Sequence, residues 1–213
     1  MSQSPILYSF RRCPYAMRAR MTLKSCHIHI ELREITLRNK PEEMLALSAK
    51  GTVPVLHLPN GHVIDESWDI AQWAISQQDP NQLLGKPHQA KQVVSLIQHN
   101  DHVFKPQLDL YKYADRFPDY PASFYRTQAE DYLKQLDSLL AKQPFLLGQS
   151  LNLIDIGIFP FIRQFAHVDI SWFAQTPHTH LQRWLNSLKS SDLFNSVMQK
   201  HTPWVAGQPP VIL

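Results

Sequence analysis

Cys13 is the residue of this sequence best suited to chemistry. It follows a short apolar run at residues 6–10 and precedes Pro14, and proline is favoured at the first position of a helix because its missing N–H would be unpaired there anyway. A thiol at a helix N-terminus faces unpaired backbone N–H groups and the positive end of the helix dipole, and both favour the thiolate. Nearby arginines, among them Arg18, add positive charge. We therefore interpret Cys13 as a nucleophile; the alternative is a packed structural cysteine.

The chemistry open to Cys13 is that of a single thiol. Ala16 stands where a Cys-x-x-Cys motif would place its second cysteine. The other cysteine, Cys26, shares an apolar helical face with Ala19 and Leu23, so packing is its expected role. A lone thiolate can attack a mixed disulfide and be regenerated by an external thiol, so a small thiol is the expected partner.

Apolar periodicity predicts the elements that position Cys13, in the order βαβαββα. Runs and alternation of apolar residues indicate the strands, and recurrence every three or four residues indicates the helices. The predicted strands are 6–10, 27–33, 53–58 and 62–64, and the predicted helices begin at Pro14, run through 44–47 and through 70–75, and the last ends before Asp79-Pro80.

The rest of the chain is predicted to be helical, with no convincing strand. Helices are expected at 89–113, 122–140, 153–166, 181–188 and 194–198. Asn152, followed three residues later by Asp155, is typical of a helix N-cap. We expect a first domain at residues 1–79, a polar linker at 80–88 and an all-helical domain at 89–213.

Composition excludes several classes of function. Apolar residues make up 44% of the 213 residues and charged residues 18%, which is ordinary for a folded globular protein. The net charge of +3 comes from scattered basic residues, so no nucleic-acid partner is expected. The sequence has neither the apolar segment of a signal peptide nor the roughly 18 apolar residues of a membrane span. We expect no membrane association and a cytoplasmic protein.

Two histidine pairs raise the question of a metal site. His27 and His29 stand beside Cys26, and His178 and His180 form a second pair. Alternation in the predicted strand puts His27 and His29 on one face while Cys26 belongs to the helical face, and no further ligands have the usual spacing. We therefore expect no metal.

Four motifs in the first eighty residues resemble those of cytosolic glutathione transferases, with the omega class nearest. They are Cys13-Pro14-Tyr15-Ala16-Met17-Arg18-Ala19-Arg20, Asn39-Lys40-Pro41-Glu42, Thr52-Val53-Pro54-Val55-Leu56 and Glu66-Ser67. The helical half matches only in general type, through Asn152-Leu153-Ile154-Asp155. The resemblance implies an α/β thioredoxin-like domain followed by an all-α domain, a homodimer, and glutathione held on the first domain.

The resemblance also implies roles for individual residues. Pro54 looks like the family's cis-proline, which leaves the backbone of Val53 free to pair with the cysteinyl part of glutathione. Glu66 and Ser67 match the site for the γ-glutamyl group, and Lys40 matches a lysine that approaches the glycyl carboxylate. The family's Asn-Pro-x-Gly is here Ser48-Ala49-Lys50-Gly51, a departure that leaves any role of that loop open.

These observations predict a glutathione-dependent thiol transferase or reductase. Cys13 would form a mixed disulfide with glutathione, the co-substrate, and the second substrate would be a small-molecule or protein disulfide. Two alternatives stay open: a non-catalytic docking module of the same fold, and conventional conjugation of glutathione to electrophiles.

Overall fold

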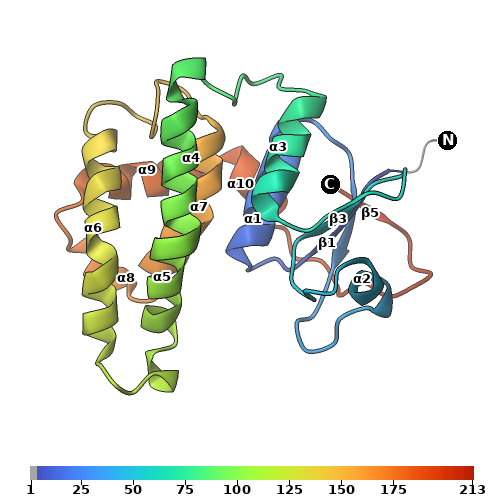
Figure 1. Ribbon diagram of the computed structural model, residues 1–213, viewed down its shortest axis with the longest axis horizontal. Coiled ribbons are helices and arrows are strands. Elements are labelled where there is room, and N and C mark those ends of the chain that lie inside the picture. Colours follow the sequence, from blue (N-terminus) through green and yellow to red (C-terminus); the bar gives the residue numbers. More distant parts are fainter. Residues whose placement is uncertain (1–3) are drawn as a thin grey trace. The chain divides into compact units, whose positions relative to one another are not determined.

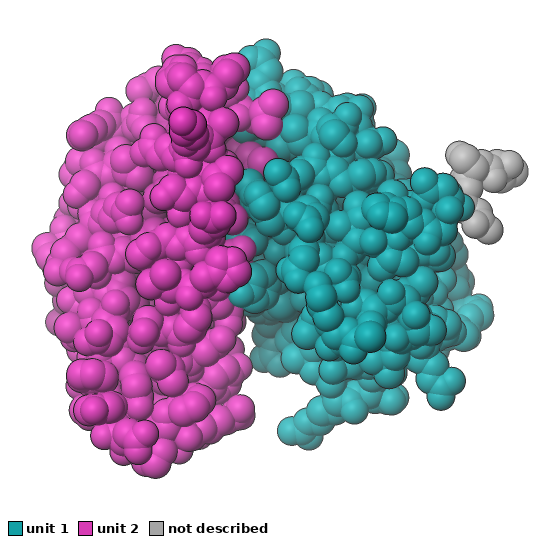
Figure 2. All heavy atoms as spheres, in the orientation of Figure 1, with its two compact units in different colours: residues 1–83, 191–213 teal, residues 84–190 magenta. Residues whose placement is uncertain are grey.

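The chain folds into two compact units. The computed structural model describes residues 4–213; unit 1 combines the residues up to Leu83 with Ser191–Leu213, and unit 2 is Leu84–Ser190 (Figure 2). The change from one unit to the other falls inside the predicted linker at 80–88. The predicted helical domain extended to residue 213, whereas the segment 191–213 belongs with unit 1 because it packs and pairs there.

Unit 1 is built on a five-stranded sheet in the order β4-β3-β1-β2-β5. β1 and β2 are parallel, and the other pairs are antiparallel. In the register of β1 with β3, Leu7 lies opposite Leu56 and Tyr8 lies opposite Val55. The strands are β1 (Ile6–Ser9), β2 (Glu31–Glu34), β3 (Val55–His57), β4 (Val63–Ile64) and β5 (Val211–Ile212).

Helices cover this sheet on both sides. α1 (Pro14–Ser25) and α3 (Ser67–Gln77) lie side by side, and α2 (Glu42–Leu47) lies apart from them, across the sheet (Figure 1). Tyr8 and Val55 form a buried cluster with Ala16 of α1 and Met44 of α2. The order βαβαββα predicted for this part of the chain is confirmed.

The end of α1 differs from the prediction. The predicted strand at 27–33 begins only at Glu31, because the chain first leaves the helix through a Schellman motif. Ile28 donates to the carbonyl of Leu23 at 3.0 Å, and His27 donates to that of Lys24 at 3.0 Å with a φ of 51°. His27 and His29 therefore do not alternate in a strand. Among the residues described, no three His, Cys, Asp or Glu side chains cluster as a metal site would require.

Unit 2 is helical. The predicted helix 89–113 is one helical path interrupted by a π-helical turn, in which Lys105 donates to the carbonyl of Asn100, five residues back. Pro106 explains the widening, since its ring would clash with the carbonyl four residues before it. The helices are α4 (Ala90–His99), the π-turn (Asn100–Phe104), α5 (Lys105–Lys112), α6 (Ala122–Leu140), α7 (Leu153–Ala166), α8 (Ile170–Ala174) and α9 (Thr179–Ser190), with 3₁₀ turns at Pro87–Gln89 and Ala114–Arg116.

The C-terminal segment returns to the sheet of unit 1. After α10 (Asp192–Val197) the chain runs along β2, where Trp204 donates to the carbonyl of Glu34 at 2.7 Å. β5 then pairs with the outer edge of β2, a strand that the sequence analysis did not predict. Two residues are too short a run to show alternation. Across residues 4–213, no helix has the length and hydropathy needed to span a bilayer.

Candidate active site

Cys13 caps the N-terminus of α1. Its backbone is extended, with φ −73° and ψ 125°, and Pro14 takes the first helical position. The Cys13 N–H donates to the carbonyl of Phe10 at 3.0 Å, and its own carbonyl accepts from Met17 at 2.9 Å. The side chain is half-buried, and Sγ lies 3.7 Å from the carbonyl oxygen of Val53. The thiol therefore lies at the N-terminus of α1, beside the loop that precedes β3.

The loop that faces Cys13 contains a cis peptide bond. The bond joins Val53 to Pro54, as the resemblance implied. Both residues are buried, and the ladder of β3 with β1 begins only at Val55. The backbone of Val53 thus lies next to the thiol and outside the paired part of the sheet.

Glu66 and Ser67 form the N-terminus of α3. Glu66 is the extended N-cap residue, and its side chain is 61% exposed. Ser67 is buried, and its Oγ accepts a hydrogen bond from Nη1 of Arg18 at 3.1 Å. Arg18 also lies over the rings of Tyr15 and Trp68. α1, which carries Cys13, is therefore tied directly to the first turn of α3.

Two lysines lie in the loops around α2. Lys50 donates to Oε1 of Glu66 at 2.6 Å and to Oδ1 of Asp65 at 3.1 Å, and Ser48 donates to the other oxygen of Asp65 at 2.6 Å. These bonds raise the pKa of Lys50, and the Ser48 hydroxyl followed by Lys50 lowers that of Asp65. The loop that departs from the family motif is thus ion-paired to the N-terminus of α3.

Lys40 lies close to Gly51, at the end of this loop. Gly51 has a φ of +59°, and a Cβ built there would come within 3.7 Å of Nζ of Lys40. The predicted residues are therefore neighbours in unit 1 through short contacts: Cys13 with Val53, α1 with Ser67, and Glu66 with the loop at 48–51. The contact of Lys50 with Glu66 was not predicted.

Two buried charged residues that bind Arg11, two positions before Cys13, were also missed by the sequence analysis. Arg20 is 1% exposed, and Glu34 is 9% exposed. Arg20 stands four residues after Ala16 and three before Leu23, so helical spacing places it on the apolar face of α1. A cation on that face was the signal available in the sequence, since a buried arginine needs partners.

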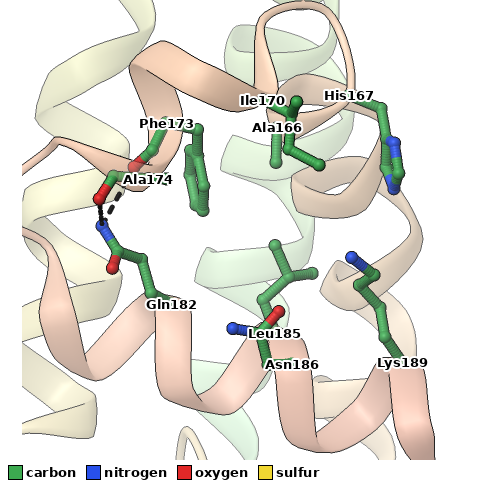
Figure 3. A pocket seen from close by; sticks show the side chains of 9 residues that line it. All are labelled: Ala166, His167, Ile170, Phe173, Ala174, Gln182, Leu185, Asn186 and Lys189. Atoms are coloured by element: carbon green, nitrogen blue, oxygen red, sulfur yellow. Dashed lines mark hydrogen bonds between the residues drawn. The ribbon is translucent and has the colours of Figure 1, made fainter.

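Unit 2 has a separate small hollow of about 90 Å³, shown in Figure 3. Phe173 and Leu185 are part of its apolar lining, and His167 and Lys189 lie at one side. The amide of Gln182 is engaged with the carbonyls of Phe173 at 2.9 Å and Thr176 at 3.0 Å. The hollow contains no predicted site residue.

Two family models match the chain. The glutathione S-transferase N-terminal domain matches residues 7–82, and the glutathione S-transferase C-terminal domain matches residues 98–187. Together they account for most of the chain.

Relatives with curated names belong to the same family. Mouse glutathione S-transferase omega-1 is 26% identical over 192 residues, which cover 89% of this chain and 78% of the relative. Rice probable glutathione S-transferase DHAR2, chloroplastic, is 24% identical over 208 residues, 94% of this chain and 71% of the relative. Human omega-2 is 43% identical over 61 residues, 29% of this chain and 25% of the relative.

Solved structures share the fold. A glutathione transferase from Pseudomonas putida, with one glutathione disulfide bound per subunit, superposes with a TM-score of 0.79 at 21% identity, covering 92% of this chain and 91% of that one. A family member from Pseudomonas fluorescens, with two glutathione bound, gives 0.80 at 17% identity, covering 93% of each chain.

Proposed function

The chain belongs to the glutathione S-transferase family, and on that premise we propose that it is an omega-like, glutathione-dependent thiol transferase in which Cys13 is the nucleophile. The observation that carries the proposal is the position of this thiol, at the N-cap of α1 with Sγ 3.7 Å from the carbonyl of Val53. Serine or tyrosine at such a position can only activate glutathione's own thiol, whereas a cysteine can form a disulfide bond with the sulfur of glutathione.

The reaction proceeds in two disulfide exchanges. The Cys13 thiolate attacks the glutathionyl sulfur of a mixed disulfide; the Cys13–glutathione disulfide forms, and the substrate leaves as a thiolate that takes a proton from water. The thiolate of a second glutathione then attacks the glutathionyl sulfur of this adduct. Cys13 leaves as the thiolate, and glutathione disulfide is released. In the net reaction the substrate sulfur is reduced to a thiol and the attacking glutathione thiol is oxidised, while the glutathionyl sulfur that is transferred stays in a disulfide.

The neighbours of Cys13 suit glutathione as the partner. The backbone of Val53 can pair with the cysteinyl residue as a short strand would. At the N-terminus of α3, Ser67 and the free helical N–H groups suit the γ-glutamyl carboxylate, while the exposed carboxylate of Glu66 suits its amino group. Lys40 is the proposed partner of the glycyl carboxylate.

The test compares cysteine variants of the full chain. Cys13→Ala should lose reduction of the mixed disulfide between glutathione and 2-mercaptoethanol, and glutathione disulfide should add one glutathionyl group to the wild-type protein but none to the variant. Cys26→Ala is the matched control and should keep both properties. Unchanged turnover in Cys13→Ala would overturn the proposal.

Further measurements on the same proteins separate the two alternative functions, the docking module and the conjugating enzyme. A docking module would show no glutathione binding by calorimetry, and its Cys13 would be alkylated no faster than a free thiol. Conventional conjugation would appear as turnover of an aryl halide that survives Cys13→Ala. Either result rejects Cys13 as the nucleophile of a thiol transferase.

The proposal includes a homodimer and a cytosolic location. Mass photometry should give twice the 24.7 kDa of one chain. A compartment that keeps Cys13 and Cys26 reduced is required for thiol chemistry with glutathione, and the cytosol is such a compartment. Cell fractionation tests this location directly.

A further inference from the structure

We propose that Arg20 is a positioning residue for Cys13, acting through the backbone of residues 9–13 and through its positive charge, which Glu34 balances. The inference rests on the proposed function, because it concerns the reactivity of the same thiol. It assigns a role to a buried pair and to the C-terminal segment, neither of which the sequence analysis placed in the glutathione site.

The guanidinium of Arg20 binds the segment that leads to Cys13. Nη2 donates to the carbonyl of Arg11 at 2.8 Å, and Nη1 donates to the carbonyl of Phe10 at 3.4 Å and to the hydroxyl of Ser9. The carbonyl of Phe10 is also the acceptor for the N–H of Cys13. Arg20 and the N–H of Cys13 thus donate to the same carbonyl oxygen, that of Phe10.

Glu34 holds the same segment from the opposite side. Its Oε1 accepts from the N–H of Arg11 at 2.6 Å, while the carbonyl of Arg11 accepts from Arg20. A buried anion and a buried cation therefore fix both polar groups of one residue, two positions before Cys13. Such charge-assisted bonds are among the stronger ones in a protein interior.

The C-terminal segment completes this arrangement. Nε of Arg20 donates to the carbonyl of Val197 at 3.1 Å, and Nη2 lies 3.9 Å from Sδ of Met198. Trp204 binds the carbonyl of Glu34 at 2.7 Å. The segment after α9 therefore supplies partners to both members of the charged pair.

Electrostatics link the pair to the thiol. Burial lowers the pKa of Arg20 to about 10, against the effect of the negative charges of Glu34 and the Cys13 thiolate, so the guanidinium stays protonated at neutral pH. Burial raises the pKa of Glu34, against the N–H of Arg11 and the charges of Arg20, His201 and Arg11. Arg11, His201 and Cys13 are therefore charged or titratable groups that act on the pair.

Two variants distinguish a purely structural role of Arg20 from a positioning role, by the direction in which each shifts the pH dependence of Cys13 reactivity. Arg20→Met removes a cation near the thiol, whereas Glu34→Gln removes an anion and keeps an oxygen acceptor for Arg11. If the pair sets the charge around Cys13, the two variants must shift the pH dependence of thiol reactivity in opposite directions. Loss of packing alone would not do so.

The experiment measures the rate of Cys13 alkylation by iodoacetamide against pH, in the full chain, by intact mass. Arg20→Met should move the midpoint upward by about one pH unit, which corresponds to a roughly tenfold slower reaction at neutral pH. Glu34→Gln should move it downward, and Arg20→Lys should keep it near the wild-type value. Lys24→Met, at an exposed lysine near the other end of α1, is the control for loss of one positive charge and should not move it.

Unchanged midpoints in folded Arg20→Met and Glu34→Gln, or shifts of both in one direction, overturn the inference. If Arg20→Met does not fold, Glu34→Gln decides alone: a downward shift supports it, and any other result rejects it. Failure of the proposed function is recognised separately, because the wild-type protein would then not reduce the glutathione mixed disulfide. Opposite shifts in a protein that does not turn over glutathione would uphold the role of Arg20 and reject the activity.

Discussion

Arg18 donates a hydrogen bond to the hydroxyl of Ser67 at 3.1 Å, and both side chains are buried. The bond joins α1 to α3. Ser67→Ala removes a buried acceptor of a charged group and should lower the free energy of unfolding by about 1–3 kcal/mol. Because the same hydroxyl is proposed to bind the γ-glutamyl carboxylate, affinity for glutathione should fall as well.

Urea unfolding and calorimetry check this prediction. Ser76→Ala is the matched control, since Ser76 lies on the same helix and is exposed, and its hydroxyl donates to the carbonyl of Trp73 and accepts from the side-chain amide of Gln77, both close by in the sequence. It should leave both quantities nearly unchanged. Equal stability of the Ser67→Ala and Ser76→Ala proteins would contradict the importance of the bond.

Glu66→Gln should weaken glutathione binding without unfolding the protein. A charge-assisted bond to the amino group of glutathione is worth about 1.5–3 kcal/mol, so affinity should fall at least about tenfold. Stability should change by less than about 1 kcal/mol, because the ion pair with Lys50 is exposed and Asp65 remains as a partner. Titration calorimetry gives the affinity. The exposed Glu42→Gln serves as control, and equal affinities for the two variants would rule out the assigned role.

Asp155→Ala should strongly destabilise unit 2. One carboxylate oxygen accepts from Leu146 at 2.9 Å and from the indole of Trp184 at 2.8 Å, and the other accepts from Asn152 at 3.1 Å. Removal leaves three buried N–H groups without this acceptor, so the loss should reach about 3 kcal/mol or more. Denaturant unfolding measures it. Asp131→Ala, at an exposed ion pair on α6, should cost under about 0.5 kcal/mol; a similar loss in both would refute the argument.

Cys26 should be inert in the folded protein. Burial, with a smaller effect of Asp79, raises its pKa to about 11. At pH 8 roughly one part in a thousand is then thiolate, the reactive form. Because this pKa is raised, burial of the neutral thiol adds to the free energy of unfolding. This contribution is fully present below the ordinary pKa near 9 and is lost as pH rises through 11.

Timed alkylation followed by peptide mapping tests Cys26. Between pH 6 and 9 the native chain should be labelled at Cys13 long before Cys26, and in urea both should react. Comparable native rates at the two cysteines would show that Cys26 is not protected.

Two long helices were predicted to the residue, since the predicted bounds 122–140 and 153–166 agree with α6 and α7. Periodicity over four or five turns leaves little freedom, and the N-cap predicted at Asn152 is confirmed, with its side chain accepting from Ile154 and Asp155. The strand predicted at 27–33 was wrong at its start. Alternation there is real, but His27 adopts the left-handed conformation usually left to glycine, and no sequence pattern marked that exit from the helix.

The candidate site was predictable where its residues stand in local motifs. Cys13 is marked by the proline after it, and Glu66-Ser67 by the helix that follows. The bond of Arg20 to Val197 was not predictable, because the two residues are 177 positions apart in the chain. Contacts of that separation depend on the tertiary fold, which composition and periodicity do not encode.

The return of the C-terminal segment to unit 1 has a consequence for synthesis. Cys13 and β1 emerge from the ribosome before unit 2, but Val197, Trp204 and β5 emerge only after the whole of unit 2. Until then β2 has an unpaired outer edge, which other chains can join. Unit 1 is therefore started before unit 2 and completed after it, and the outer edge of β2 stays open to aggregation while unit 2 is synthesised.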